Sequence, residues 1–428
     1  MDLIVPNLAD FNLRNITALL EPASMQSFGA FGMTFADQAV FWSCRPRVLV
    51  LYPGVDQEWL SDVHTALGSA VPPIVAPCTR TGALIPDLLA DAGALAELRS
   101  SLGSPRQVHI LFWGATREAY ELIAVVSSWG HEVVADVPPE ASFWTSSYLD
   151  SKLSVADLAA GIQGIQLPRT WTVANWTELR GALRLLVSKE GDAVVKSAYG
   201  VGGKGCAIVT ADPRSEEQFW SDVGSGPFFR DFPMLVQQYV RHEPGAARSA
   251  VDILIGAHGI EQAITSTDSG DGWQLLAIGW DSPLLPSSLS GRLRNASATI
   301  AEAAAQMGFR GWIGADFIAG QDGQIYLIEL NARRTGGMHG VGLLSRSTGL
   351  SRPGVACSAD ALALTTAQRP TYAIIRSAFH HMWARGLAVY PSTVRGLTRD
   401  QPLMGVVAIA SNAARAHELV GEALSLTS

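Results

Sequence analysis

The sequence predicts a protein of the α/β class with additional α+β lobes, and three features of the chain support that class. Residues 46–150 alternate between short apolar runs and helical stretches, a pattern that builds a layered α/β domain. Four glycines fall within residues 200–205, between two further apolar runs. Asp322-Gly323 lies between two more strand-like runs, which is typical of a β-hairpin. A chain of 428 residues is long enough for two or three domains.

The first part of the chain, residues 1–145, is expected to form a small α/β domain. Residues 47–53 and 108–113 are apolar runs that end in Pro or Gly, as buried parallel strands often do. Helical patterns cover residues 58–68, 83–102 and 116–129.

A glycine-rich segment joins the apolar run 193–195 to the apolar run 206–209. This order predicts a strand, a flexible loop and a returning strand. Backbone N–H groups in such a loop can approach phosphate oxygens closely. The candidate phosphate-binding residues are Lys196, Gly200, Gly202, Gly203, Lys204 and Gly205. The P-loop pattern that leads into a helix is not present, and a plain surface hairpin is the alternative interpretation.

A second hairpin is predicted from residues 311–319 and 324–331, with Asp322-Gly323 as a two-residue turn. Counting outward from that turn places Asp316 opposite Glu329, and Asn331 falls on the same face. Two facing carboxylates repel each other unless a cation lies between them, and oxygen ligands suit Mg²⁺. Asp316, Glu329 and Asn331 are therefore the candidate metal ligands. A solvated strand face that carries two acids is the alternative.

The remaining elements are predicted from their apolar periods. Residues 175–190 form a helix whose stripe of Trp176, Leu179, Leu183 and Leu186 is expected to face the core. Residues 292–307 form another helix, and 266–272 a turn or flap. In a C-terminal α/β domain over residues 346–428, strands are expected at 371–378 and 404–410 and a helix at 412–424.

Taken in order, these motifs resemble those of the ATP-grasp carboxylate–amine ligases. Asp150-Ser151-Lys152-Leu153 followed by Gly164-Ile165-Gln166-Leu167-Pro168 resembles the opening motif of that family, and residues 329–333 read Glu-Leu-Asn-Ala-Arg, like its metal and phosphate motif. The resemblance implies an ATP-grasp domain over residues 146–345, with a lid lobe at about 170–235 and a metal-binding lobe at about 236–345.

The same resemblance assigns roles to individual residues. Lys152 and Lys196 would reach ATP, and Gln238, Tyr239, Val240 and Glu243 would form the hinge that holds adenine and ribose. Gln238 stands where many relatives have glutamate. Mg²⁺, with Mn²⁺ as an alternative, would bind at the paired acids. Arg333 would clamp the transferred phosphoryl group, with Lys196 and Arg248 as further catalytic residues.

Residues 331–337, Asn-Ala-Arg-Arg-Thr-Gly-Gly, are most similar to the amino-acid and peptide ligases, and among these to the pheganomycin-type peptide ligases. The implied reaction joins an amino-acid-like or guanidino acid to an amino acid or peptide through an acyl phosphate, in secondary metabolism such as antibiotic biosynthesis. The substrates would contact Arg248, Arg334, Gly336, Gly337 and His339. For Arg334 a surface charge, for His339 a structural role and for Arg248 an ion pair with Asp252 are the alternatives.

Composition excludes other classes of function. The net charge of −8 argues against a nucleic-acid or anionic-membrane partner, since both attract clustered Lys and Arg. The four cysteines are scattered without zinc spacing, which fits a reducing cytoplasm. The N-terminal residues do not resemble a signal peptide. Homodimers are common in the family, so a homodimer is the assembly to test. A carboxylase and a non-catalytic nucleotide-binding regulator are the alternative functions.

Overall fold

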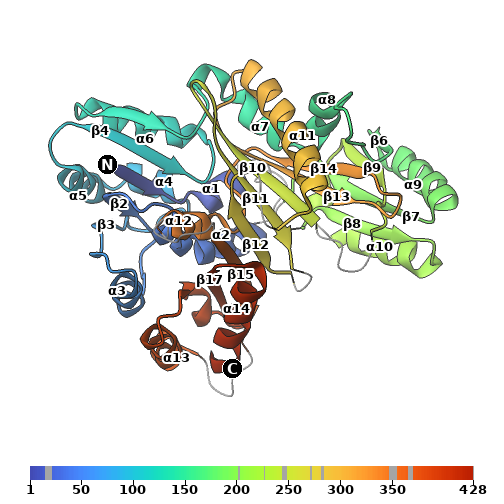
Figure 1. Ribbon diagram of the computed structural model, residues 1–428. Coiled ribbons are helices and arrows are strands. Elements are labelled where there is room, and N and C mark those ends of the chain that lie inside the picture. The colour runs from blue at the N-terminus through green and yellow to red at the C-terminus, as the bar shows by residue number, and fades with distance from the viewer. Residues whose placement is uncertain are drawn as a thin grey trace.

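The computed structural model describes residues 1–14, 22–200, 203–225, 227–242, 248–269, 272–280, 284–346, 354–364 and 370–427. Over these residues the chain forms a five-stranded, a four-stranded and an eight-stranded sheet. In Figure 1 the five-stranded sheet lies at the left and the four-stranded sheet at the right. The eight-stranded sheet lies between them and continues down toward the C-terminus. The expected α/β class is confirmed.

The five-stranded sheet is parallel and belongs to the first part of the chain. Its strands, in spatial order, are β3 Ile74–Val75, β2 Arg47–Val50, β1 Asp2–Val5, β4 Gln107–Phe112 and β5 Glu132–Ala135. The two predicted strands are confirmed as β2 and β4. Both pair with β1, which the sequence did not predict because four residues are too short to show an apolar period.

Helices pack around this sheet, and one of them differs from the prediction. They are α1 Leu8–Leu13, α2 Pro22–Ala36, α3 Gln57–Ala66, α4 Leu84–Leu89, α5 Ala92–Leu102 and α6 Arg117–Ser128. The single helix expected over residues 83–102 is wrong, because Asp91 interrupts it. The Asp91 side chain accepts hydrogen bonds from the N–H groups of Gly93 and Ala94, an N-cap that begins a second helix.

The four-stranded sheet forms a separate lobe. Its antiparallel strands are β6 Thr170–Val173, β9 Met234–Gln238, β7 Asp192–Ser197 and β8 Cys206–Thr210, covered by α9 Trp176–Glu190 and α10 Pro213–Ser225. The strand, loop and strand predicted around residue 200 are confirmed as β7 and β8. Leu179, Leu183 and Leu186 are buried as expected, but Trp176 is 42% exposed and packs against the rings of Trp220 and Phe232.

The eight-stranded sheet has the order β14-β13-β10-β11-β12-β15-β17-β16. Its strands are β10 Arg248–Gly256, β11 Gly259–Asp268, β12 Gln274–Ile278, β13 Gly311–Ala319, β14 Ile325–Asn331, β15 Val355–Ala363, β16 Val389–Thr393 and β17 Leu403–Ala410. Because β12 pairs with β15, the sheet continues across residue 345. The division of the chain into units at residues 145 and 345 stays a proposal.

The helices that accompany this sheet are α7 Trp144–Asp150, α8 Val155–Ala159, α11 Ser287–Gln306, α12 Met338–Arg346, α13 Tyr372–Ala384 and α14 Ala413–Thr427. The helices predicted at 292–307 and 412–424 are confirmed. The strand predicted at 371–378 is wrong, because the buried side chains of Tyr372, Ile375 and Phe379 recur with a helical spacing. The turn expected at 266–272 is partly wrong, because β11 continues to Asp268 and residues 270–271 lie outside the described residues.

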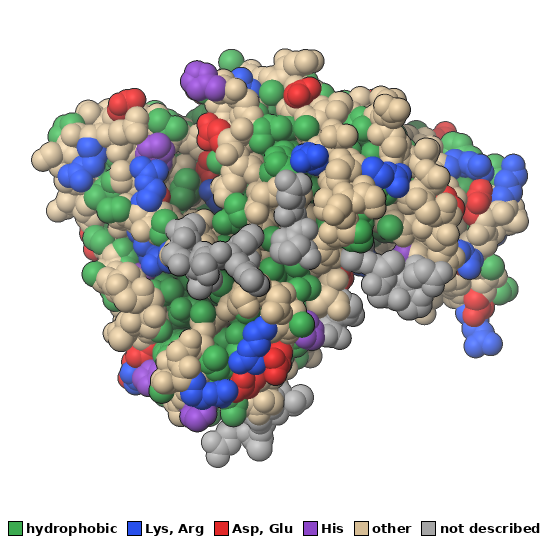
Figure 2. All heavy atoms as spheres, in the orientation of Figure 1, with side chains coloured by type: hydrophobic (Ala, Val, Ile, Leu, Met, Phe, Trp, Pro, Cys, Tyr) green, Lys and Arg blue, Asp and Glu red, His purple; other side chains and the backbone are tan. Residues whose placement is uncertain are grey.

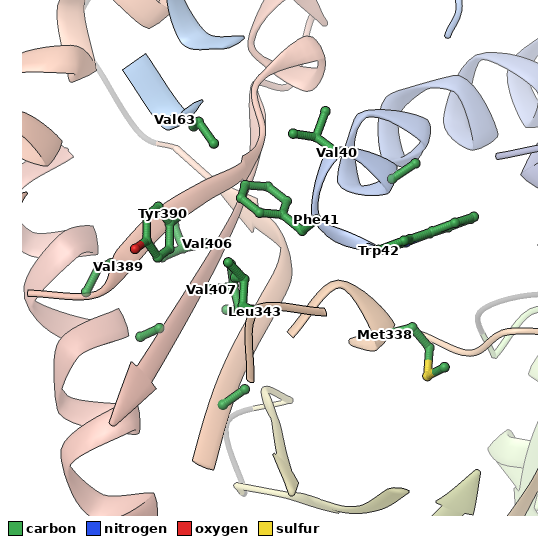
Figure 3. Packing of buried hydrophobic residues seen from close by; sticks show 14 of the residues in the cluster. Val40, Phe41, Trp42, Val63, Met338, Leu343, Val389, Tyr390, Val406 and Val407 are labelled. Atoms are coloured by element: carbon green, nitrogen blue, oxygen red, sulfur yellow. The ribbon is translucent and has the colours of Figure 1, made fainter. Parts of the chain in front are cut away.

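A shared apolar core joins the first and last parts of the chain. Figure 3 shows Phe41, from the 3₁₀ helix η2 (Asp37–Phe41), beside Tyr390, Val406 and Val407 of β16 and β17. Figure 2 shows the surface hollowed between the C-terminal end at the bottom and the four-stranded lobe at the right, with acidic and basic side chains interspersed on this face. Among the described helices, none is both long enough and apolar enough to cross a membrane.

Candidate active site

Nine of the twenty predicted site residues line one cavity of about 260 Å³. The glycine loop, the β13–β14 hairpin and the segment after β14 all contribute to its walls. Its lining includes the predicted residues Lys152, Gly200, Gly203, Lys204, Asp316, Glu329, Asn331, Arg333 and Gly336. Cys206, Ala250, Ser266, Gln274 and Thr335, which the sequence did not single out, also line it.

The acidic pair lies where the sequence predicts it, although the hairpin reaches that register by another route. Asp316 pairs with Glu329. Near the turn, however, Ala319 pairs with Ile325, one residue away from the predicted register, and Ile328 is an extra residue before Glu329. This β-bulge restores the predicted alignment. Without it, Asp316 would lie opposite an isoleucine.

The two carboxyl groups have opposite electrostatic surroundings. Burial raises the pKa of Asp316, and the nearby charges of Glu329 and Asp252 raise it further. Burial alone would also raise the pKa of Glu329, but Lys152 and Lys196 outweigh it and the net shift is downward. Lys152 Nζ lies 3.1 Å from Glu329 Oε1. The pair therefore holds one carboxylate that ionises readily and one whose ionised form needs a further cation.

Lys196 depends on the bulge for its position. Its Nζ donates a hydrogen bond of 3.0 Å to the carbonyl oxygen of Ile328, the extra residue of the hairpin. Burial lowers the pKa of Lys196, while Glu329 opposes that shift. The lysine on the lid strand β7 thus reaches across to the hairpin, and it brings positive charge to the acidic pair.

Arg333 is fixed from several sides. Its Nη2 donates to Asn331 Oδ1 at 2.7 Å and its Nη1 to the carbonyl oxygen of Arg334 at 3.0 Å. Its Nε lies 3.7 Å from Asp150 Oδ1, and the same carboxylate is 3.7 Å from Arg14 Nη2. Asn331 in turn donates to Asp316 Oδ2 at 3.1 Å. The guanidinium therefore stands beside the acidic pair in one hydrogen-bonded chain.

Two glycines of the described part of the glycine-rich segment, Gly200 and Gly205, are tightly packed. A Cβ at Gly200 would lie 2.2 Å from the carbonyl oxygen of Lys204 and 3.2 Å from Lys152 Nζ. Gly205 has φ +82°, and a Cβ there would lie 2.5 Å from Ser197 Oγ. Both positions therefore need glycine. Gly202 lies outside the described residues.

The predicted hinge borders a different, smaller cavity. Gln238, Tyr239 and Val240 line a space of about 190 Å³ together with residues 320–322 of the β13–β14 turn. The N–H of Gln238 donates to the carbonyl oxygen of Arg169 at 2.8 Å. Glu243 lies outside the described residues.

Three predicted substrate residues lie apart from the acidic pair. Arg248 is exposed at the start of β10, and the alternative ion-pair partner Asp252 accepts a hydrogen bond from Thr335 instead. Arg334 is buried and pairs with Asp136 at 2.5 Å. His339 is buried beside Ser358, with 3.0 Å between its Nε2 and the serine Oγ.

Gly337 has φ +79°, and a Cβ there would lie 2.8 Å from Gln274 Oε1. It follows Gly336, which lines the cavity. Gly336 therefore borders the site. Arg334 instead joins the segment after β14 to Asp136, which follows β5 of the parallel sheet.

Asp252 is an acid near the site that sequence reasoning missed as a site residue. It is buried on β10 and accepts a hydrogen bond from Thr335 Oγ1 at 2.9 Å. Burial raises the pKa of Asp252 to about 7. Ala250 pairs with Asp316, and Asp252, two residues further along β10, lies on the same face of the sheet. The alternation of side chains along a strand could therefore have identified Asp252 as a neighbour of the site. Gln274 gives no such signal, because β12 is brought to the site by long-range pairing.

Within the described part of the chain, no group of three or more His, Cys, Asp or Glu side chains is close enough to hold a metal ion by itself. Asp316, Glu329 and Asn331 nevertheless offer the oxygen donors that Mg²⁺ accepts when the remaining ligands are water and substrate phosphates. The donor set therefore fits a cation that arrives with a nucleotide.

Comparison with known proteins rests on structure. No protein-family model matches the sequence, and no curated protein does. Biotin carboxylase of Campylobacter jejuni, in its β-γ-ATP complex, has a TM-score of 0.56 and 14% identity, over 99% of this chain and 90% of that chain. L-amino acid ligase of Bacillus licheniformis has a TM-score of 0.51 and 12% identity, over 99% and 96% of the two chains.

N5-carboxyaminoimidazole synthetase of Staphylococcus aureus, complexed with ADP, has a TM-score of 0.51 and 11% identity, over 99% and 96% of the two chains. At these identities the likeness concerns the fold. The chain has the ATP-grasp fold, preceded by a small α/β domain, and the expected fold is confirmed.

Proposed function

We propose that this protein is an ATP-dependent carboxylate–amine ligase that forms an amide bond through an acyl phosphate, with release of ADP and phosphate. One observation carries the proposal. The facing acids Asp316 and Glu329 and the cations Lys152 and Arg333 line a single cavity, and Lys196 contacts the acidic hairpin. Such a set suits phosphoryl transfer, where positioning and charge stabilisation do most of the catalysis.

The cations would hold the nucleotide phosphates in place. Lys152 and Lys196 approach the cavity from the segment before the lid and from lid strand β7, and Gly200 lies beside Lys152 Nζ. A bound carboxylate can then attack the γ-phosphorus in line, the bond to the leaving ADP oxygen breaks, and an acyl phosphate forms. The amine next attacks the acyl carbon. The bond between that carbon and the phosphate oxygen breaks, and one amine proton leaves with inorganic phosphate.

Asp316, Glu329 and Asn331 are the residues that would hold a divalent cation, through their side-chain oxygen atoms. Mg²⁺ would neutralise the phosphate charge when bound; Mn²⁺ is the alternative. The chain itself keeps Glu329 ionised through Lys152 and leaves Asp316 short of positive charge. This imbalance supports a cation site, because burying a carboxylate without a cation is costly.

Arg333 is the proposed clamp for the transferred phosphoryl group. Its planar guanidinium can donate to two phosphate oxygens at once. Asn331, Asp150 and the carbonyl oxygen of Arg334 fix its position before substrate binds. Preorganised donors of this kind stabilise charge that develops in the transition state.

The narrower proposal is a peptide ligase of the pheganomycin type, which joins an amino-acid-like or guanidino acid to an amino acid or peptide in secondary metabolism. The Gly336-Gly337 turn after Arg333 supports it, as does the fold shared with the L-amino acid ligase of Bacillus licheniformis. Arg248 is the proposed contact for the carboxylate substrate. The cytoplasm and a homodimer are the setting and assembly proposed with it.

The test is product analysis. Purified protein with Mg²⁺, ATP and pooled amino, guanidino and peptide acids is expected to release ADP and phosphate, and to yield a mass equal to two substrates minus water. Hydroxylamine in place of the amine is expected to trap the acyl phosphate as a hydroxamate. AMP with pyrophosphate would overturn the mechanism. ADP release that depends on bicarbonate would indicate a carboxylase, and nucleotide binding without turnover a regulator.

A further inference from the structure

The cavity extends across the sheet from Glu329 on β14 to Gln274 on β12, and the Gln274 end offers a buried hydrogen-bond acceptor. Gly336 and Gln274 both line the cavity there. Gln274 Oε1 is buried and has no hydrogen-bond partner among the described residues. It lies 3.4 Å from the position that a Cβ would take at Gly336. A buried acceptor without a donor is costly, so this end is suited to a ligand that brings N–H groups.

Asp360, on β15, lies beside Gly336, although it does not itself line the cavity. Its Oδ1 accepts hydrogen bonds from Gln38 Nε2 at 2.9 Å and from Ser358 Oγ at 2.8 Å. Its Oδ2 is 3.7 Å from the Cβ position of Gly336, and the side chain is 28% exposed. One oxygen of the carboxylate is therefore anchored in the fold, while the other faces the glycine that borders the cavity.

His339 does not neutralise this carboxylate. Its Nε2 lies 3.4 Å from Asp360 Oδ1, but burial lowers the pKa of His339, which leaves the imidazole neutral at pH 7. Lys152, Lys204 and Arg333 line the cavity together with the acids Asp316 and Glu329. Beside Gly336 lie the Asp360 carboxylate and the buried Gln274 Oε1, which offers a further acceptor.

We propose that Asp360 binds the ammonium group of the acceptor substrate and, with Gln274, orients that substrate at Gly336 for attack on the acyl phosphate. The inference rests on the proposed ligase function and deepens it. The acceptor is of the class that reaches the enzyme as a primary ammonium ion, and it loses its proton to solvent before it attacks. Specificity for the amine is then set by β12 and β15 rather than by the phosphate-binding motifs.

A purely structural role is the competing explanation, because the Gln38–Asp360 bond also ties η2 to β15. The variants separate the two. Asp360→Asn removes the charge, Asp360→Glu keeps it, and Gln38→Leu removes the tie while Asp360 stays charged. A structural role predicts a loss in Gln38→Leu at least as large as in Asp360→Asn, because the amide oxygen of the asparagine can still accept the bond from Gln38. A binding role predicts a loss in Asp360→Asn alone.

The measurement compares two reactions of each purified variant. With the amine identified by product analysis, Asp360→Asn is expected to raise KM for the amine about tenfold or more, since a charged hydrogen bond is lost. Hydroxamate formation with hydroxylamine, which is mostly uncharged at pH 7.5, is expected to stay within about twofold. Asp360→Glu and Gln38→Leu are expected to keep the wild-type KM within about threefold.

The outcomes are distinguishable from failure of the ligase proposal. If wild-type protein forms neither amide nor hydroxamate, the proposed function fails. If it forms both and Asp360→Asn leaves KM for the amine unchanged, or lowers amide and hydroxamate formation in parallel, the inference about Asp360 fails. A KM increase in Gln38→Leu at least as large as that in Asp360→Asn would also overturn it, in favour of the structural role.

Discussion

The two ends of the candidate active site differ in the way the chain assembles them. The end proposed to bind phosphate, the phosphate end, contains Asp316 and Glu329, which face each other across one local hairpin, and Arg333, which follows that hairpin. The end proposed to bind the acceptor amine, the acceptor end, contains Gln274, Gly336 and Asp360. There Gln38 and Asp360 meet although they are 322 positions apart in the sequence. The first end is made by neighbouring residues and the second by the order of strands in a sheet.

This difference suggests how a fold of this kind can keep one reaction while its substrates change. Under the proposed function, the phosphate end would activate a carboxylate whatever amine follows, because Glu329, Lys152 and Asp316 are held against one another at a single hairpin. Residues of β12 and β15 at the acceptor end can change without altering the β13–β14 hairpin. If so, variants at the two ends should affect different halves of the reaction, and hydroxamate trapping distinguishes those halves.

The largest effect is expected from Glu329→Gln. The change removes the charge that faces Asp316 and pairs with Lys152 at 3.1 Å, so amide and hydroxamate formation should both fall by about 10³-fold or more. Nucleotide binding, measured by calorimetry, should persist because the lysines and the loop remain. Glu418→Gln, at an exposed acid of α14, is the control. Turnover that survives Glu329→Gln would mean that the acidic pair is not the cation site.

A smaller loss at the same end is expected from Arg333→Lys. An ammonium cannot reproduce the planar donation of a guanidinium, and the bond to Asn331 Oδ1 at 2.7 Å would be lost. Both reactions should slow by about 10²-fold, with KM for the amine unchanged. Arg415→Lys, at an exposed ion pair with Glu418, is the matched control. A change confined to KM for the amine would place Arg333 at the acceptor end and break the comparison.

Much of the phosphate end could be predicted from the sequence because the rules that govern it are local. Counting from a two-residue turn predicted the pair Asp316 and Glu329, but three residues, 321–323, form the turn, and the bulge at Ile328 offsets that one-residue error. The bulge could not be predicted from the sequence pattern, and the carbonyl oxygen of Ile328 is also what Lys196 binds. The predicted pair is therefore correct, although the three-residue turn without the bulge would place Asp316 opposite Ile328.

The acceptor end could not be predicted, because its residues come together only through long-range strand pairing. Gln274 and Asp360 are neighbours of Gly336 because β12 pairs with β15, and such pairing leaves no periodic signal in either strand. The strand β1 was missed for another reason, because its four residues are too short to show an apolar period. Residues 371–378 show a third limit, since an apolar run without its neighbours can be read as strand or helix.

A moderate effect, confined to the acceptor end, is expected from Gly336→Ala. The added methyl group would lie 3.4 Å from Gln274 Oε1 and 3.7 Å from Asp360 Oδ2, so it takes up acceptor space without a clash. KM for the amine should rise about fivefold, a steric cost of roughly one methyl group, while hydroxamate formation stays constant.

Gly337→Ala is the contrasting variant for that test. It is strained at φ +79° and should lower the midpoint of thermal unfolding. Equal thermal losses in the two variants would show that Gly336 is structural.

His64→Gln is expected to have the smallest effect on turnover at neutral pH. This variant tests the pH range in which the protein stays folded, and therefore the range in which variants at the two ends can be compared. His64 is fully buried in α3. Burial first, and then the charges of Arg47 and Arg346, lower the pKa of His64 from its usual 6.5 to about 4. The folded protein therefore binds fewer protons than the unfolded chain between these values, so stability is complete above pH 6.5 and falls as the pH drops toward 4. The total loss in the free energy of unfolding is about 3 kcal/mol.

The measurement is urea unfolding at pH 7.5, 6 and 5. The unfolding midpoint should decline with falling pH in the wild type and decline less steeply in His64→Gln. Activity that falls below pH 6.5 in the wild type but not in the variant would then report loss of the fold, whereas equal declines in both would place the titrating group in the site itself.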